Sequence, residues 1–290
     1  MALNIQVFKT RALTAVVFVA VMLSGLLWNQ WSFLALFSLI HFGCWIEYQK
    51  IIALIYPPYK DISNFHRNFI MLIGFAFMLL NANNSYRFGR ITMHGIGWYG
   101  LQLFTILFCL NEIVIKKNLN IKVIGYSLLG LVYISLSWGL MLRLQDDSAL
   151  INHTFSDATW QLPVILIASI WINDTMAYIV GSFIGKTPFS PISPKKTWEG
   201  TIGGAILAIV VVTFGCKYLF HIDNIKLLLI ISSTAAIVGT YGDLLESKLK
   251  RMAGVKDSGQ IMPGHGGFLD RFDSLLLATP AVWLLIQLFI

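Results

Sequence analysis

The strongest constraint on the fold is a long run of sequence without charge. Between Arg11 and Glu47 the chain has no Asp, Glu, Lys or Arg. A transmembrane helix needs roughly 20 mostly apolar residues, so this run is too long for one helix, and the polar pair Asn29 and Gln30 divides it into two. Seven further apolar segments follow along the chain. The nine predicted transmembrane segments are 12–28, 31–46, 68–82, 97–115, 122–142, 161–184, 200–219, 225–242 and 274–290.

The composition excludes a soluble globular protein. Hydrophobic residues make up 57% of the 290 residues and charged residues only 12%, whereas a soluble domain has about 45–50% and about 25%. The cysteines Cys44, Cys109 and Cys216 lie in apolar runs without paired spacing, which argues against a disulfide framework or a zinc site. We therefore predict an all-α integral membrane protein, a polytopic helical bundle with about nine transmembrane helices.

The distribution of charge predicts how the chain is oriented. With a cytoplasmic N-terminus, 16 of the 21 Lys and Arg residues fall on the cytoplasmic side, as the positive-inside rule requires. The other five are Arg87, Arg90, Arg143, Lys217 and Lys226. We expect residues 1–290 to form a single membrane domain, in which 1–160 contributes helices with few motifs and 161–290 contributes catalytic helices and cytoplasmic loops.

Two polar residues lie in the middle of the predicted segment 161–184. Asn173 and Asp174 occur in the run W-I-N-D-T-M-A-Y, and a carboxylate near the bilayer centre costs roughly 2.5–3.5 kcal/mol on insertion scales. A functional role in a wet cavity is favoured over a packing role satisfied by Lys or Arg. Glu47 is a weaker case, because it lies at the end of a predicted span and snorkelling to the interface explains it equally well.

The segment 185–200 reads G-K-T-P-F-S-P-I-S-P-K-K-T-W-E-G. It is not a phosphate-binding P-loop, because only three residues separate Gly181 from Gly185 where that motif needs four. Three prolines predict a stiff loop that presents a small polar set with little entropy left to lose, although an ordinary positive-inside loop is an alternative. That set is Ser193, Lys195, Lys196 and Thr197. The next helix opens with Gly200, Gly203 and Gly204, which allow close helix approach.

The segment 242–273 concentrates charge between two apolar spans. Its acids are Asp243, Glu246, Asp257, Asp270 and Asp273, and its bases are Lys248, Lys250, Arg251, Lys256 and Arg271. His265 lies among Gly264, Gly266 and Gly267, whose backbone N–H groups can approach an anion closely. Carboxylates beside phosphate-binding bases are typical of magnesium-dependent phosphoryl or nucleotidyl transfer. A solvated, salt-bridged loop is the alternative.

These motifs resemble those of a known family. The string S-K-L-K-R, four residues, then K-D-S-G-Q-I-M-P-G-H-G-G-F-L-D-R-F-D, from Ser247 to Asp273, closely resembles the signature of phosphatidate cytidylyltransferases, also called CDP-diacylglycerol synthases. Met262 is a small departure from it. The elements N-D-T-M-A-Y and S-P-K-K-T-W-E-G are also similar to that family, and the resemblance covers about residues 160–290.

The resemblance implies that CTP and phosphatidate react to give CDP-diacylglycerol and pyrophosphate, on the cytoplasmic face of a bacterial inner membrane. It also implies a Mg²⁺ cofactor paired with K⁺, and a homodimer. By resemblance the metal ligands are Asp243, Asp270 and Asp273. The residues that neutralise phosphates are Lys250, Arg251, Lys256, His265 and Arg271. The substrate-binding set is Ser193, Lys195, Lys196, Thr197, Asp174, Ser247, Gly266 and Gly267, with Asp174 lining the polar cavity or assisting the metal.

Two other functions stay open at this point. A related CTP-using lipid kinase would transfer the terminal phosphate instead of the cytidylyl group. A transporter of an anionic substrate belongs to a different class, and the inverted repeat that would favour it is not evident in the sequence. The net charge of +7 is interpreted as membrane topology plus a site for two phosphorylated substrates, and no nucleic-acid partner is expected.

Overall fold

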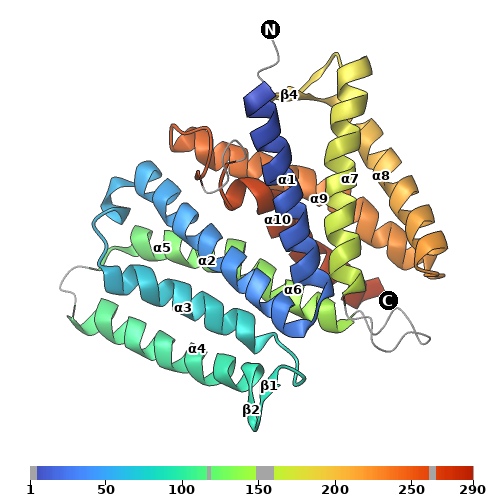
Figure 1. Cartoon of the computed structure of the whole chain (residues 1–290). Helices are drawn as coiled ribbons and strands as arrows, with labels where there is room; N and C mark the ends of the chain where they lie inside the picture. Colours follow the sequence, from blue (N-terminus) through green and yellow to red (C-terminus); the bar gives the residue numbers. More distant parts are fainter. Residues whose placement is uncertain (1–4, 116–118, 148–159, 261–265, 290) are drawn as a thin grey trace. The chain divides into compact units, whose positions relative to one another are not determined.

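A computed structural model describes residues 5–115, 119–147, 160–260 and 266–289 (Figure 1). The described chain is mostly helical, with two short β-hairpins that the all-α prediction did not include. The helices are α1 Ile5–Leu27, α2 Gln30–Ile55, the 3₁₀ turn Pro57–Tyr59, α3 Asn64–Leu80, α4 Met93–Cys109, α5 Ile121–Gly130, α6 Leu136–Asp147, α7 Gln161–Ile184, α8 Trp198–Leu219, α9 Ile225–Met252 and α10 Leu269–Phe289. The hairpins are β1 Arg87–Phe88 with β2 Ile91–Thr92, and β3 Pro188–Ser190 with β4 Ser193–Thr197.

Six helices of the described chain are long and apolar enough to cross a membrane, so the protein is a helical integral membrane protein. They are Met93–Val114, Ile121–Asp147, Gln161–Ile184, Trp198–Leu219, Ile225–Met252 and Leu269–Phe289. In α4 the apolar side chains Ile96, Leu103 and Ile106 are exposed, as lipid-facing residues are. The other three predicted segments are also helical, in α1, α2 and α3. The count of nine spans stays a prediction.

Hydrogen bonding explains why the first charge-free run is two helices. Helix α1 ends at Leu27 and α2 begins at Gln30. Asn29 is the N-cap of α2: its side chain accepts a hydrogen bond from the Ser32 N–H at 2.9 Å, and the Ser32 hydroxyl accepts one from the Asn29 N–H at 3.0 Å. This reciprocal cap satisfies two donors that have no partner inside the helix. The predicted break at Asn29 and Gln30 is confirmed.

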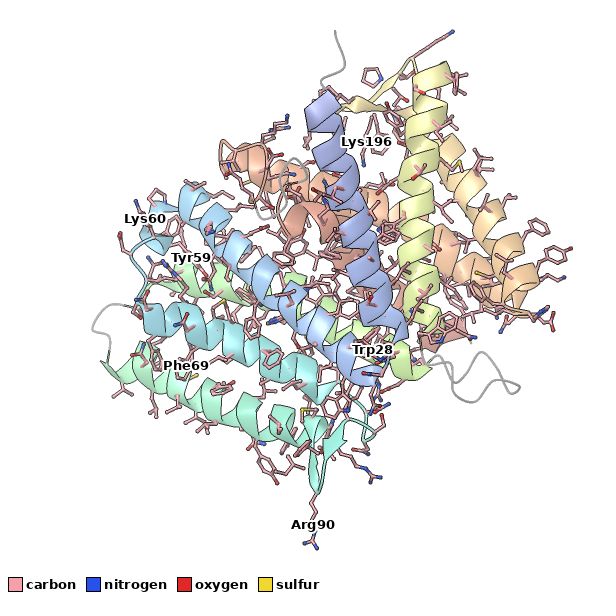
Figure 2. The ribbon with its side chains drawn as sticks, viewed as in Figure 1. Trp28, Tyr59, Lys60, Phe69, Arg90 and Lys196 are labelled. Atoms are coloured by element: carbon pink, nitrogen blue, oxygen red, sulfur yellow. The ribbon has the colours of Figure 1, made fainter. Side chains whose placement is uncertain are left out.

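The chain forms two compact units. Unit 1 consists of Met1–Leu142 and Met252–Arg271, and unit 2 consists of Arg143–Arg251 and Phe272–Ile290. In unit 1 the β1–β2 hairpin is exposed, and the side chain of Arg90 extends from its tip (Figure 2). The expectation of a single membrane domain stays a prediction.

Polar side chains inside unit 1 are paired with one another. A π-helical segment, Leu131–Ser135, joins α5 to α6, and the Ser135 hydroxyl lies 3.0 Å from His41 Nε2 and 2.9 Å from Trp45 Nε1. His66 on α3 lies 3.1 Å from a Glu112 carboxylate oxygen and 2.8 Å from the Ser127 hydroxyl. Since lipid offers no hydrogen bonds, polar side chains between transmembrane helices must pair with one another to avoid a large free-energy cost.

In unit 2, α7 and α8 lie side by side (Figure 1) and approach closely through glycines. A Cβ atom at position 204 would lie 2.6 Å from the Ala177 Cα, and one at position 200 would lie 2.8 Å from the Ala177 carbonyl oxygen. A Cβ atom at position 203 would lie 2.7 Å from the Val180 side chain. The predicted close approach at Gly200, Gly203 and Gly204 is confirmed.

The helices extend further into the charged motif than the predicted spans do. Helix α9 continues to Met252, although its predicted span ends at residue 242, and α10 begins at Leu269, although its predicted span begins at residue 274. The helix propensities of Leu, Glu, Lys and Arg are within a few tenths of a kcal/mol of that of Ala. The charged residues therefore end the apolar run but do not end the helix. Asp243 and Asp270 are therefore helical residues and not loop residues.

The glycine contact between α7 and α8 can be tested by a substitution. Gly204→Leu would place a side chain into the backbone of Ala177, and overpacking of this kind typically costs about 1–3 kcal/mol. We expect a lower free energy of unfolding for purified protein in detergent, measured by thermal and denaturant unfolding. The control is Gly215→Ala in the same helix, where a Cβ atom meets nothing within 4 Å, and its stability should not fall. Equal stability of the two variants would contradict the packing.

Candidate active site

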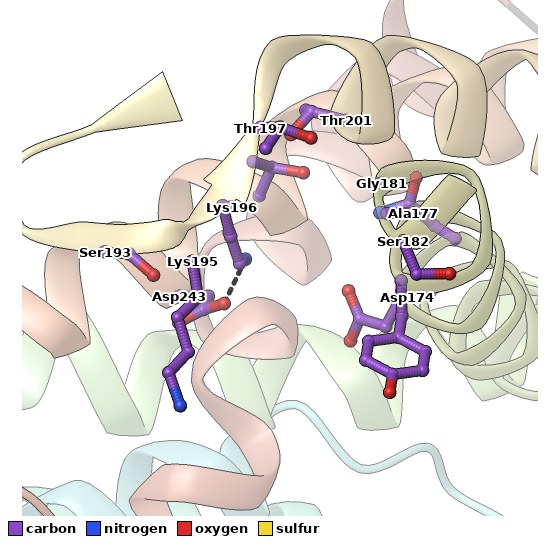
Figure 3. A pocket seen from close by; sticks show the side chains of 13 residues that line it. Asp174, Ala177, Gly181, Ser182, Ser193, Lys195, Lys196, Thr197, Thr201 and Asp243 are labelled. Atoms are coloured by element: carbon purple, nitrogen blue, oxygen red, sulfur yellow. Dashed lines mark hydrogen bonds and ion pairs between the residues drawn. The ribbon is translucent and has the colours of Figure 1, made fainter. Parts of the chain in front are cut away.

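A pocket of about 470 Å³ in unit 2 brings together residues from three separate motifs (Figure 3). Helix α7 contributes Asp174, and α9 contributes Asp243. Strand β4 and the cap of α8 contribute the predicted polar set, which is Ser193, Lys195, Lys196 and Thr197. These six residues were predicted as site residues from the sequence, and Asn173, Tyr178 and Thr201 are further lining residues.

One ion pair crosses the pocket. The Lys196 ammonium contacts the Asp243 carboxylate, and Figure 3 shows Asp174 on the other side of the pocket from this pair. The two side chains are 29% and 26% exposed, so ligand and water can reach them. The Ser247 hydroxyl, one turn further along α9, donates to the other oxygen of Asp243 at 3.3 Å. Asp243 is thus oriented by a cation and a hydroxyl.

The segment that presents the lysines is a β-hairpin, not the stiff loop expected from its prolines. Strand β3 pairs antiparallel with β4, with Pro188 opposite Thr197 and Ser190 opposite Ser193. Proline lacks an N–H but can still accept through its carbonyl at the edge of a two-stranded sheet. The lysine pair therefore lies on a strand whose register is set by pairing.

Glu199 holds this hairpin against the start of α8. Its carboxylate accepts hydrogen bonds from the N–H of Lys186 at 3.1 Å, from the N–H of Thr187 at 3.1 Å and from the Thr187 hydroxyl at 2.8 Å. The Thr197 hydroxyl accepts from the Gly200 N–H at 3.2 Å and caps α8. Glu199 was not among the residues predicted from the sequence, although an acid in the first turn of a helix is a recognisable signal.

The pocket adjoins the N-terminal turn of α8. Thr197 and Thr201 line it together with Lys195 and Lys196. The first turn of a helix has unpaired N–H groups and a positive partial charge, so this end favours an anion. Two lysines beside a helix N-terminus can bind phosphate groups.

Carboxylates gather in unit 2 where α9 meets α10. A Cβ atom at Gly242 would lie 2.6 Å from the Asp273 carbonyl oxygen, so glycine is needed for this close approach. Asp273 lies close enough to Asp243, Glu246 and Asp174 to interact with each electrostatically. Lys250, a predicted phosphate-binding residue, forms an ion pair with the buried Glu246.

This group of acids fits a divalent cation. Mg²⁺ prefers oxygen ligands, typically one or two carboxylates, with water and substrate phosphates completing the shell. Within the described ranges no three His, Cys, Asp or Glu side chains converge closely enough to hold a metal ion by themselves. The donors present match a cation that substrate oxygens and water would help to bind.

Asp270 belongs to unit 1, where its carboxylate binds a turn of its own segment. Its Oδ2 accepts from the Ser258 N–H at 2.8 Å and from the Gly267 N–H at 2.8 Å, and the Ser258 hydroxyl oxygen lies 2.9 Å away. Gly266 has a φ of 80°, a conformation that glycine adopts without strain. The Gly267 N–H, predicted to approach a substrate anion, is therefore used by a carboxylate of the protein itself.

The remaining predicted residues are placed as follows. Lys256 and Arg271 are exposed, and Arg251 lies in the last turn of α9. His265 and Gly264 lie outside the described residues. Glu47 is only 1% exposed, so the snorkelling interpretation is wrong: its side chain points into the protein and not toward an interface.

The protein is thus a helical membrane protein whose pocket places two lysines and a helix N-terminus where phosphate groups can bind. A family model described as the cytidylyltransferase family matches residues 9–289, and the chain belongs to this family. The predicted family resemblance is confirmed.

Three relatives illustrate the similarity, and each is called phosphatidate cytidylyltransferase. The protein from Synechocystis sp. is 33% identical over 300 residues, which cover 96% of each chain. The Bacillus subtilis protein is 38% identical over 199 residues, covering 67% of this chain and 70% of the relative. The Staphylococcus haemolyticus protein is 49% identical over 121 residues, covering 40% and 45%.

The role of Glu199 in holding the hairpin leads to a prediction. Glu199→Gln removes the charge that strengthens three hydrogen bonds to Lys186 and Thr187, since bonds to an ionised acceptor are about twice as strong as neutral ones. We expect trypsin to cleave the native protein after Lys195 and Lys196 several-fold faster, as followed by mass spectrometry. The control is Asp223→Asn, which also removes one carboxylate charge, at a residue just after the C-terminal end of α8. Cleavage at the wild-type rate in Glu199→Gln would contradict the anchoring role.

Proposed function

We propose that this protein transfers the cytidylyl group of CTP to phosphatidate, producing CDP-diacylglycerol and pyrophosphate for phospholipid synthesis. The observation that carries the proposal is the pocket, which places Lys195, Lys196 and Asp243 together in a member of the cytidylyltransferase family. The relatives named phosphatidate cytidylyltransferase support the choice of phosphatidate and CTP as substrates.

The proposed cytidylyl transfer does not need a strong general base. A phosphate monoester loses its second proton near pH ~6, so phosphatidate is a dianionic nucleophile at neutral pH. One of its oxygens forms a bond to the α-phosphorus of CTP, and the bond between that phosphorus and the oxygen bridging to the β-phosphate breaks. The electron pair leaves with pyrophosphate. Catalysis therefore depends on bringing two polyanions together and on stabilising the charge of the leaving group.

The residues of unit 2 are suited to these tasks. Lys195, Lys196 and the first turn of α8 bind phosphate oxygens, and the hairpin held by Glu199 fixes their position. Asp174 and Ser193 complete the polar wall of the pocket. By the family resemblance, further bases are proposed to neutralise phosphates: Lys250 and Arg251 in unit 2, and Lys256, His265 and Arg271 in the part of the motif outside unit 2.

Mg²⁺ is the proposed cofactor, with K⁺ as its proposed companion. Asp243 and Asp273 in unit 2 are proposed carboxylate ligands, and Asp270 keeps the role of metal ligand that the family resemblance implies. A divalent cation bound there supplies positive charge to the phosphate oxygens as pyrophosphate departs. The electrostatic interaction of Asp273 with Asp174, Asp243 and Glu246 supports this proposal, because like charges repel and a bound cation offsets the repulsion.

The proposed topology has nine spans, a cytoplasmic N-terminus and a pocket that opens to the cytoplasm of a bacterial cell, where CTP is made. The helical state of all nine predicted segments and the positive-inside distribution of Lys and Arg support it. Assembly as a homodimer stays a prediction from the family resemblance.

A labelling experiment tests the reaction. Purified protein in detergent is supplied with phosphatidate, Mg²⁺ and CTP labelled at either the α- or the γ-phosphate. We expect α-label in the lipid product, γ-label in pyrophosphate, and loss of both products when EDTA removes the metal. A lipid kinase would put γ-label into lipid, and a transporter would label no lipid. Either result would contradict the proposal.

The proposed metal ligand can be tested separately. Asp243→Asn should lower the rate of CDP-diacylglycerol formation more than about 100-fold, because losing even an outer partner of a metal ligand costs about 10- to 100-fold. Asp270→Asn should act in the same direction. The control is Asp147→Asn, which removes the same charge. The Asp147 carboxylate is in unit 2, accepts a hydrogen bond from Gln287 and does not line the pocket. Full activity of Asp243→Asn would refute its assignment.

A further inference from the structure

We propose that Glu47, in the N-terminal half of the chain, is a positioning residue that orients the carboxylate of Asp270 for metal binding. This inference rests on the proposed function, because that function makes Asp270 a metal ligand. Both residues belong to unit 1. Glu47 is on α2, and Asp270 is in the first turn of α10.

Glu47 is a buried carboxylate with a defined set of donors. It is 1% exposed. One of its oxygens accepts from the Phe268 N–H at 2.9 Å, and the other accepts from the Leu269 N–H at 2.9 Å and from the Ser258 hydroxyl at 2.6 Å. In the described part of the chain these partners are all neutral. Backbone donors at a helix N-terminus stabilise an anion, so Glu47 fixes the point at which α10 begins.

Ser258 links Glu47 to Asp270. Its hydroxyl lies 2.6 Å from Glu47 Oε2 and 2.9 Å from Asp270 Oδ2, and its N–H donates to the same Asp270 oxygen at 2.8 Å. Holding Oδ2 in this way sets the plane of the Asp270 carboxylate and the direction of its second oxygen. Glu47 acts on that carboxylate in two ways, through Ser258 and through the start of the helix that carries Asp270.

The glycines around Glu47 leave room for its side chain. Cβ atoms added at Gly259 or Gly267 would collide with the Glu47 carboxylate, and one added at Gly43 would collide with the ring of Phe268. Two glycines of the family-like motif are thus small because Glu47 occupies the space beside them. This observation distinguishes Glu47 from a charge that merely reaches an interface.

Helix packing alone does not explain a carboxylate at this position. An apolar side chain of similar volume usually holds two elements together at no loss of stability, whereas a buried charge is costly to desolvate. A carboxylate is useful where it must orient donors and a neighbouring ligand, and outer partners of metal ligands perform this task.

The test uses two variants that keep the charge of the site. Glu47→Asp shortens the side chain by one methylene, so it cannot reach Ser258 and the two N–H groups together. Ser258→Ala removes only the linking hydroxyl. Mn²⁺ binding to the purified full-length chain, without substrate, is measured by electron paramagnetic resonance. We expect affinity about 10-fold weaker in both variants.

Gln49→Asn is the matched control. Gln49 lies on the same helix, is 5% exposed and donates to the Arg67 carbonyl at 3.0 Å, and this change also removes one methylene. It should lower the thermal unfolding temperature about as much as Glu47→Asp while leaving Mn²⁺ affinity at the wild-type value.

Each outcome decides the inference. Wild-type Mn²⁺ affinity in Glu47→Asp, or equal weakening in Gln49→Asn, would overturn the positioning role, as would a wild-type chain that binds no Mn²⁺. If Glu47→Asp does not fold, Ser258→Ala decides by the same criterion. The proposed function fails separately: a wild-type chain that makes no CDP-diacylglycerol refutes the reaction, while the Mn²⁺ comparison still tests Glu47.

Discussion

The structure depends on how a few carboxylates are stabilised among apolar helices. Lipid provides no hydrogen bonds, so each acid inside the protein needs a donor or a cation from the chain itself. Glu112 has His66, Glu246 has Lys250, and Asp243 has Lys196. Glu47 instead uses a hydroxyl and two backbone amides. The partners of Glu112, Asp243 and Glu47 lie on other elements of the chain, whereas Glu246 and Lys250 lie one turn apart on α9.

Close helix packing gives the pocket its shape. Because glycines of α8 rest on Ala177, the α7 wall that carries Asp174 lies within reach of the α8 cap at Thr197. Gly242 does the same for α9 and α10 beside Asp243 and Asp273. A polar pocket in a membrane protein is thus formed by small residues that bring backbones together, while charged side chains are placed around the contact. Both kinds of residue occur in the same short motifs.

Hydropathy and motif spacing predicted the helices and most of the pocket, because apolar length and residue type are local properties. They did not predict where α9 and α10 end, because charged residues lower hydropathy without lowering helix propensity. They also missed Glu199, and they left Glu47 open between a functional role and snorkelling. The partner of Glu47 at Ser258 is 211 residues away along the chain, and no local pattern indicates such a contact. Glu199 lies near its partners, but those partners are mostly backbone amides, which are present at almost every residue.

The two halves of the chain differ in the kind of residue that they contribute. The cytidylyl donor and the lipid phosphate are polyanions, so basic residues or a bound cation are needed to hold them, and the residues predicted for this task all lie after residue 160. Flexible basic side chains alone would bind phosphates in many geometries, whereas an in-line displacement needs one. In the proposed site, precision comes from acids that hold other groups in place, Glu199 at the start of α8 and Glu47 on α2. The N-terminal half, which has few recognisable motifs, can therefore still influence the reaction through Glu47. The contacts of Glu47 in the folded protein indicate this role, and its neighbours in the sequence do not.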